Sequence, residues 1–267
     1  MSPRPTRPPT RKTKPARSTK PARSAKPASP TKPARPGPRR AARAAAAPIG
    51  EVIARLDRAH PDAKLALDFT SPLELLIALI LAAQCTDAKV NEVTPALFRE
   101  FPTAAAFAAV DQDTLERWLK PTGFFRQKSR AVRACCQALV DRFAGEVPRD
   151  FDDLLSLPGV GRKTANILRG NAFGLPGIGV DTHVGRLSQR LGFTTNTDPD
   201  KIEADLVPLV PTANQIRFCH LLQYHGRRIC FARKPDCPAC VLLDICPFPD
   251  KTVTKPSEPP AKRSRWV

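Results

Sequence analysis

Apolar side chains recur at intervals of three and four residues through most of the chain from Ile49 onward, the spacing of one face of an α-helix. Proline, glycine and clusters of Asn, Asp and Thr separate these stretches. No competing stretch alternates apolar and polar residues as a half-buried strand does. Many short helices with short connections predict an all-α protein. The predicted helices are Ile49–Ala59, Pro72–Ala83, Ala88–Phe98, Asp113–Leu119, Lys128–Phe143, Phe151–Leu155, Lys163–Ala172, Thr182–Leu191, Pro199–Val207 and Ala213–Gly226.

The first 48 residues have a different composition. Lys and Arg number fourteen there, no acidic residue precedes Glu51, and Lys-Pro-Ala recurs every six residues from Lys14. The segment therefore carries most of the formal net charge of +18. Because it has too little apolar surface to offset the entropy of ordering, we expect residues 1–47 to form a disordered basic tail. Its charge favours attraction to phosphates, and a merely solubilising extension is the alternative.

The longest apolar run, Leu73–Ala83, contains Glu74 and is far shorter than the roughly 20 residues that span a bilayer. It predicts a buried helix. The N-terminal basic residues are followed neither by the apolar core of a secretory signal nor by the amphipathic helix of a transit peptide. We therefore expect a cytoplasmic protein without a membrane partner, and a monomer.

Eight cysteines in a reducing compartment favour metal binding or catalysis over disulfides. Four of them lie close together, with six, two and five residues between successive members: Cys230, Cys237, Cys240 and Cys246. Four thiolates at short range suit either Zn²⁺ or an iron–sulfur cluster, and the residue types leave both alternatives open. We expect the other four, Cys85, Cys135, Cys136 and Cys219, to be small core residues.

Residues 157–165 read Leu-Pro-Gly-Val-Gly-Arg-Lys-Thr-Ala and lie between two predicted helices. Gly159 and Gly161 permit positive φ and a close approach of the backbone, so that successive N–H groups at the start of the next helix can bind an anion. An ordinary tight turn is the alternative interpretation.

This nine-residue sequence resembles the helix-hairpin-helix motif of the endonuclease III family of DNA base-excision glycosylases, and the resemblance extends from about Ile49 to Pro247. It implies that Lys163 is the nucleophile and that Asp181, within Val-Asp-Thr-His-Val, is the catalytic aspartate. It implies DNA-binding roles for Gly159, Gly161 and Arg162. It also implies that the four clustered cysteines hold a [4Fe–4S] cluster rather than zinc.

The implied activity is that of a bifunctional glycosylase and AP lyase. A lysine amine that attacks C1′ of the sugar displaces the base and leaves a Schiff base, from which β-elimination breaks the strand. Asp181 is expected to stabilise positive charge at the sugar and to cap the following helix, whereas His183 is expected only to orient that helix. The implied partner is duplex DNA that contains oxidised or ring-saturated pyrimidines or abasic sites. In a bacterium the protein would then be associated with the nucleoid.

Two alternatives remain at this point. An adenine-mispair glycosylase shares the hairpin and the cluster, but it usually lacks a lysine at the position of Lys163 and carries an additional C-terminal domain. A non-catalytic DNA-binding helix-hairpin-helix module would have no reason to combine Lys163 with Asp181.

An enzyme that acts on a base within a duplex must extrude that base and fill the gap. The resemblance implies that Gln84 is the residue that fills the gap. It places Phe124 at a position more often occupied by Leu, where a wedge enters the stack, and the adjacent Phe125 is the alternative wedge.

The family fold implies two helical domains. Residues 65–175 are expected to form a six-helix domain that contains the hairpin, and residues 48–64 with 176–250 to form an iron–sulfur cluster domain built from both ends of the chain. Lys163 and Asp181 would face each other across the cleft between the domains. Residues 251–267 are expected to be a flexible C-terminal tail.

Overall fold

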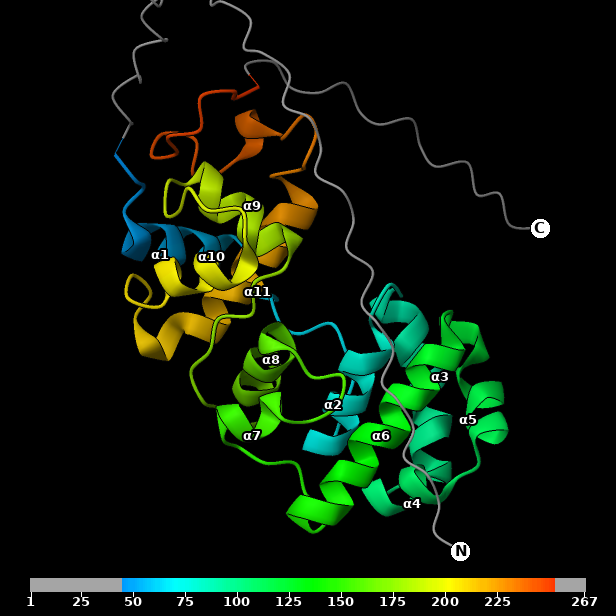
Figure 1. Cartoon of the computed structure of the whole chain (residues 1–267). Coiled ribbons are helices and arrows are strands. Elements are labelled where there is room, and N and C mark those ends of the chain that lie inside the picture. The colour runs from blue at the N-terminus through cyan, green and yellow to red at the C-terminus, as the bar shows by residue number, and fades with distance from the viewer. Residues whose placement is uncertain (1–44, 253–267) are drawn as a thin grey trace, which may run out of the picture. The chain divides into compact units, whose positions relative to one another are not determined.

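The computed structural model describes residues 45–252, shown in colour in Figure 1. All regular structure in this range is helical, with eleven α-helices, three short 3-10 helices and no strand, so the predicted all-α class is confirmed. Most of the predicted N-terminal and C-terminal tails, residues 1–44 and 253–267, lies outside the described residues.

The α-helices are α1 Ile49–Ala59, α2 Pro72–Leu81, α3 Asp87–Glu100, α4 Ala104–Ala109, α5 Gln112–Leu119, α6 Phe125–Phe143, α7 Phe151–Leu155, α8 Arg162–Phe173, α9 Thr182–Arg190, α10 Pro199–Leu206 and α11 Gln215–Arg228. The 3-10 helices are η1 Lys120–Thr122, η2 Thr212–Asn214 and η3 Cys237–Ala239.

Every helix predicted from the apolar spacing is present, with its ends moved by at most three residues. The helix that the spacing did not predict is α4, which raises the number between residues 65 and 175 to seven α-helices. Its sequence, Ala-Ala-Ala-Phe-Ala-Ala, has no polar face and therefore no periodicity. The signal that marks it is Thr103, whose side chain accepts a hydrogen bond from the amide of Ala106 and caps the helix.

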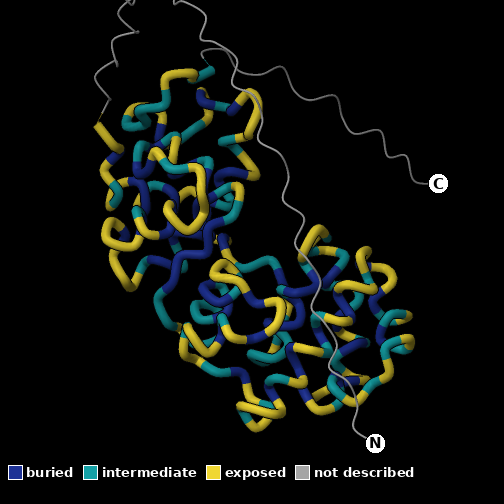
Figure 2. The backbone as a smooth tube through the Cα atoms, viewed as in Figure 1, coloured by how far each residue is buried: buried dark blue, intermediate teal, exposed yellow. Residues whose placement is uncertain are grey.

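Buried apolar side chains form two clusters. One is built from helices α2 to α8 and includes Phe107, Leu119 and Leu139. The other is built from α1, α9, α10, α11 and the loop that follows α11. In Figure 1, α1 lies beside α9, α10 and α11, and Figure 2 shows buried residues, in dark blue, inside both groups. The division into two domains stays a prediction, since the described residues pack as one compact unit.

The first residue along the chain that belongs to this second cluster is Ala47. It is buried, and its amide donates to the carbonyl of Leu191 at 2.9 Å. Helices α8 and α11, one from each group, are in contact, because Gly170 of α8 lies against Ile216 of α11 with no room for a side chain. None of the helices described is both long and apolar enough to cross a membrane.

Candidate active site and cysteine loop

The hairpin connects α7 to α8. Leu157 and Val160 are buried and anchor it, and the Val160 amide donates to the carbonyl of Leu157 at 3.1 Å. Gly159 has φ +81°, the left-handed conformation that glycine adopts without strain. Gly161 instead has φ −102°, so the interpretation of both glycines as positive-φ residues holds only for Gly159.

Gly161 serves a different purpose at the start of α8. It occupies the N-cap position and provides no side-chain hydrogen bond to the first amides of the helix. A Cβ added there would meet no atom within 4 Å. The absence of a side chain therefore leaves the amides at the start of the helix open to an approaching anion.

Lys163 is the second residue of α8, and it is exposed beside this open helix terminus. Asp181 is half-buried and precedes α9, where its Oδ1 accepts hydrogen bonds from the amides of His183 at 2.9 Å and Val184 at 2.8 Å. The expected capping role of Asp181 is thus present.

The segment from Gly177 to Asp181 runs along α8 toward the N-terminus of that helix. Asn166 of α8 donates its Nδ2 hydrogen to the carbonyl of Ile178 at 3.1 Å. One turn nearer the helix start, a Cβ on Gly179 would lie 2.7 Å from Cγ1 of Ile167 and 3.4 Å from the Lys163 carbonyl oxygen. Asp181 follows two residues after Gly179, whose Cβ position already lies 3.4 Å from the Lys163 carbonyl oxygen.

The sequence reasoning did not identify Gly177 and Gly179 as residues of the site. Both are buried, and a Cβ on Gly177 would lie 2.8 Å from Oδ1 of Asn166. The signal for them is a Gly-X-Gly pair directly before Val-Asp-Thr, which permits backbone to approach backbone closely.

His183 packs between α9 and α11, with Nδ1 3.2 Å from Nη2 of Arg186. Burial lowers the pKa of His183, and the charges of Arg186 and Arg227 act in the same direction against the influence of Asp181. These contacts agree with the structural role expected for His183.

The guanidinium of Arg162 contacts α10. Its Nη2 and Nε donate to the two carboxylate oxygens of Glu203 at 2.7 and 3.1 Å, and the guanidinium stacks on Phe151 with 4.9 Å to the ring centroid. A guanidinium engaged by a buried carboxylate has fewer free donors for phosphate. The expected DNA-binding role of the Arg162 side chain therefore stays a prediction that the geometry does not favour.

Gln84 and Phe124, far apart in sequence, line one cleft together with Gly159 and Thr164 of the hairpin region. Both have left-handed backbones, with φ +52° at Gln84 and +48° at Phe124, a conformation that costs energy for residues with a Cβ. Phe124 is 60% exposed, whereas Phe125 is half-buried against the first apolar cluster. The geometry therefore favours Phe124 over Phe125 as the wedge.

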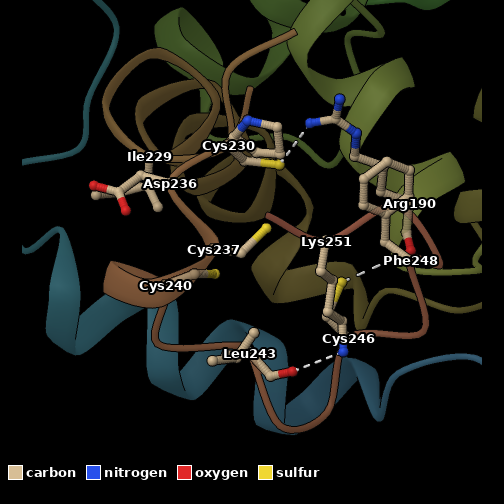
Figure 3. Close-up of a pocket in the computed structure, with 11 residues that line it drawn as sticks. Arg190, Ile229, Cys230, Asp236, Cys237, Cys240, Leu243, Cys246, Phe248 and Lys251 are labelled. Carbon is tan, nitrogen blue, oxygen red and sulfur yellow. Dashed lines mark hydrogen bonds between the residues drawn. The ribbon is translucent and has the colours of Figure 1, made fainter. Parts of the chain in front are cut away.

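The four clustered cysteines line one cavity after α11 (Figure 3), and their sulfur atoms border the space that the loop encloses. Two of the sulfurs have side-chain N–H neighbours: Nη1 of Arg190 donates to Sγ of Cys230 at 3.1 Å, and Nε2 of His225 lies 3.3 Å from Sγ of Cys240. Burial raises the pKa of Cys240 to about 11, and a bound metal would favour its thiolate. Of the other cysteines, Cys135, Cys136 and Cys219 are buried as expected, and Cys85 is half-buried.

Comparison with known proteins places this arrangement in a family. The profile that matches residues 77–212 is described as the HhH-GPD superfamily of base excision DNA repair proteins. Endonuclease III of Synechocystis sp. is 49% identical over 198 residues, which are 74% of this chain and 90% of that protein. Endonuclease III of Escherichia coli is 38% identical over 201 residues, which are 75% and 95% of the two chains.

Among solved structures, a trapped endonuclease III–DNA covalent intermediate matches with a TM-score of 0.71 and 43% identity, covering 74% of this chain and 93% of that one. Fold and hairpin together define a base-excision DNA repair protein of the helix-hairpin-helix class. Within that class the chain belongs to the endonuclease III family and is a DNA glycosylase and AP lyase. Neither the adenine-mispair alternative nor the non-catalytic one is favoured by these relatives.

Proposed function

We propose that this enzyme binds duplex DNA and excises oxidised or ring-saturated pyrimidines, with Lys163 as its nucleophile and Asp181 as the assisting carboxylate. The observation that supports this proposal is the path of the segment before Asp181 along α8, in which the Cβ position of Gly179 lies 3.4 Å from the Lys163 carbonyl oxygen. A covalent mechanism is supported by the related endonuclease III, which was trapped in a covalent intermediate with DNA.

The proposed chemistry begins at the side-chain amine of Lys163. Nζ attacks C1′, the glycosidic bond breaks, and the base leaves with the bonding electron pair and takes up a proton. Opening of the C1′–O bond gives the Schiff base. Loss of a proton from C2′ then expels the 3′ phosphate, and hydrolysis of the Schiff base releases Lys163. Asp181 stabilises positive charge at the sugar and accepts the proton that Nζ loses.

Recognition of the duplex uses the open start of α8 and the cleft beside it. The uncapped amides at the start of α8, directly after Gly161, can bind a backbone phosphate. Such a contact contributes affinity that does not depend on base sequence. Phe124 enters the stack as the wedge, and Gln84 fills the gap left by the extruded nucleotide.

We assign a [4Fe–4S] cluster to Cys230, Cys237, Cys240 and Cys246. All four cysteines border one cavity. The choice of an iron–sulfur cluster over zinc rests on the resemblance of their spacing to that of the endonuclease III family. When bound, the cluster supplies four metal–sulfur links that close the loop.

Borohydride trapping tests the nucleophile. Reduction of the Schiff base gives a stable secondary amine, so wild-type protein incubated with a duplex containing one ring-saturated pyrimidine should form a covalent adduct. We expect Lys163→Ala to form none. The matched control is Lys201→Ala, because Lys201 is also an exposed lysine in the first turn of a helix. An adduct that persists in Lys163→Ala would assign the chemistry to another residue.

A further inference from the structure

Lys128, in the first turns of α6, is buried although it carries an ammonium group. Only 4% of its surface is exposed. Its Nζ donates to the carbonyl oxygen of Thr122 at 2.7 Å. The ion pairs found in the described part of the chain do not include it. Burial lowers the pKa of Lys128.

Protein stability does not explain a buried cation in this setting. Removing an ammonium from water costs free energy, and an apolar side chain of the same length often replaces a buried charge at no loss of stability or with a gain. We therefore look for the role of the ammonium in its one hydrogen bond, to the carbonyl of Thr122.

That hydrogen bond ends on the turn that presents Phe124. Gly123 has φ +68° and ψ +162°, and Phe124 has φ +48° and ψ +27°, so two successive residues have positive φ and Phe124 adopts the left-handed helical conformation. On the helix side, the amides of Gln127 and Lys128 both donate to the Phe124 carbonyl at 3.0 Å. On the other side, the bond from Lys128 holds the Thr122 carbonyl, directly before Gly123. The turn is thereby fixed at both ends.

Lys128 also borders the cleft lined by Gln84, Phe124 and Gly159. Lys128 thus lines the same cleft as the two residues proposed to enter the duplex.

We infer that Lys128 is a positioning residue for base extrusion: its hydrogen bond to Thr122 holds the strained turn in the conformation that points Phe124 outward. This inference rests on the proposed role of Phe124 as the wedge. Lys128 itself needs no contact with DNA or with the reacting atoms.

The test compares Lys128→Met with Lys120→Met and Phe124→Ala. Methionine has a similar length but cannot donate to Thr122. Lys120 is exposed in η1 just before the same turn, so its substitution removes a charge without removing the bond. The measurement is the single-turnover excision rate at saturating enzyme, on a duplex and on a single strand that carry one thymine glycol. A 2-aminopurine beside the lesion reports the opening of the stack by its fluorescence.

We expect Lys128→Met to lower the excision rate on the duplex about tenfold, as loss of a base-stacking aromatic contact would. The rate at which the 2-aminopurine fluorescence rises should fall by the same factor. Its single-strand rate and melting temperature should equal those of the wild type, and Lys120→Met should be unchanged in each measurement. Lys128→Gln, whose side chain is too short to reach Thr122, should repeat the duplex defect if Lys128→Met folds poorly.

A double-mutant comparison separates this inference from the proposed wedge. Because Lys128 acts through Phe124, adding Lys128→Met to Phe124→Ala should cause little further loss. Losses that multiply, or a normal duplex rate in Lys128→Met and Lys128→Gln, would overturn the positioning role while leaving the wedge intact. Equal losses of Phe124→Ala on duplex and single strand would instead refute the wedge, and the role of Lys128 with it.

Discussion

We propose that Asp181 combines two functions, a helix cap and a catalytic charge, in one carboxylate. Its Oδ1 accepts both hydrogen bonds at the start of α9, which leaves Oδ2 for the reaction that we propose. Asparagine offers a side-chain oxygen for the cap but has no negative charge, whereas alanine offers neither. Substitutions at this residue can therefore separate stability from chemistry.

We expect Asp181→Asn to keep the melting temperature of the wild type, because Asn caps helices about as well as Asp. Excision should fall by at least about a hundredfold, because the charge that stabilises the transition state is lost. Asp181→Ala should lose the same activity and about 1 kcal/mol of stability as well. Thermal melts and single-turnover excision measure the two effects.

Asp198→Asn is the control for this pair, since Asp198 caps α10 through the amide of Lys201 and lies outside the proposed chemistry. It should leave both measurements unchanged. Wild-type excision by Asp181→Asn would show that the carboxylate acts only as a cap.

At the scale of elements, the site depends on a backbone segment packed against a helix. Gly179 has no room for a side chain, because its Cβ position is 2.7 Å from the Ile167 side chain. The small residue lets the segment follow α8 closely, and we propose that this path brings Asp181 toward Lys163. Any added atom must move either the segment or Ile167.

Gly179→Ala should therefore lower the free energy of unfolding by roughly 1–3 kcal/mol, as overpacking does, and should lower excision at saturating substrate. Adding Ile167→Ala removes the obstructing side chain and should recover part of the excision rate. Denaturant unfolding and single-turnover kinetics test both variants.

Gly50→Ala provides the control, because Gly50 lies in α1 with no atom within 4 Å of its Cβ position. It should be neutral or slightly stabilising, as alanine favours helix. Unimpaired excision by Gly179→Ala would show that the close approach does not position Asp181.

At the scale of the whole molecule, the cysteine loop is attached to the first helix of the described chain. Arg55 of α1 donates to both carboxylate oxygens of Asp244, at 2.6 and 3.0 Å, and to the carbonyl of Val241 at 3.0 Å. These bonds join segments almost 190 residues apart. An iron–sulfur cluster bound by the cysteine loop would therefore stabilise the second apolar core as well as the loop itself.

We expect the purified protein to contain about four irons and to lose nearly all of them in Cys237→Ser, which removes one of four ligands. The free energy of unfolding should fall with the iron, because metal binding contributes to folding. Metal analysis and thermal melts check this. Cys219→Ser is the control: it alters a buried core cysteine of α11 and should keep its iron. Stoichiometric zinc without iron in anaerobically prepared wild type would overturn the assignment.

The sequence by itself determined the helices, the hairpin, Lys163, Asp181 and the four clustered cysteines as candidates. Helices are encoded locally, through apolar spacing and caps, so they can be read without knowledge of the fold. The candidate residues could be recognised because each belongs to a short motif. The apolar spacing did not predict helix α4, because an alanine-rich stretch has no polar face and so shows no helical period.

Only the tertiary structure decided how these parts meet. It showed that residues 177–181 follow α8, that Arg162 is engaged by Glu203, and that Phe124 rather than Phe125 is exposed. It also revealed Lys128, which in sequence is one basic residue among many. The physical reason is that burial, close approach and hydrogen-bond partners depend on residues distant in the chain, and local patterns carry no record of which distant surfaces pack together.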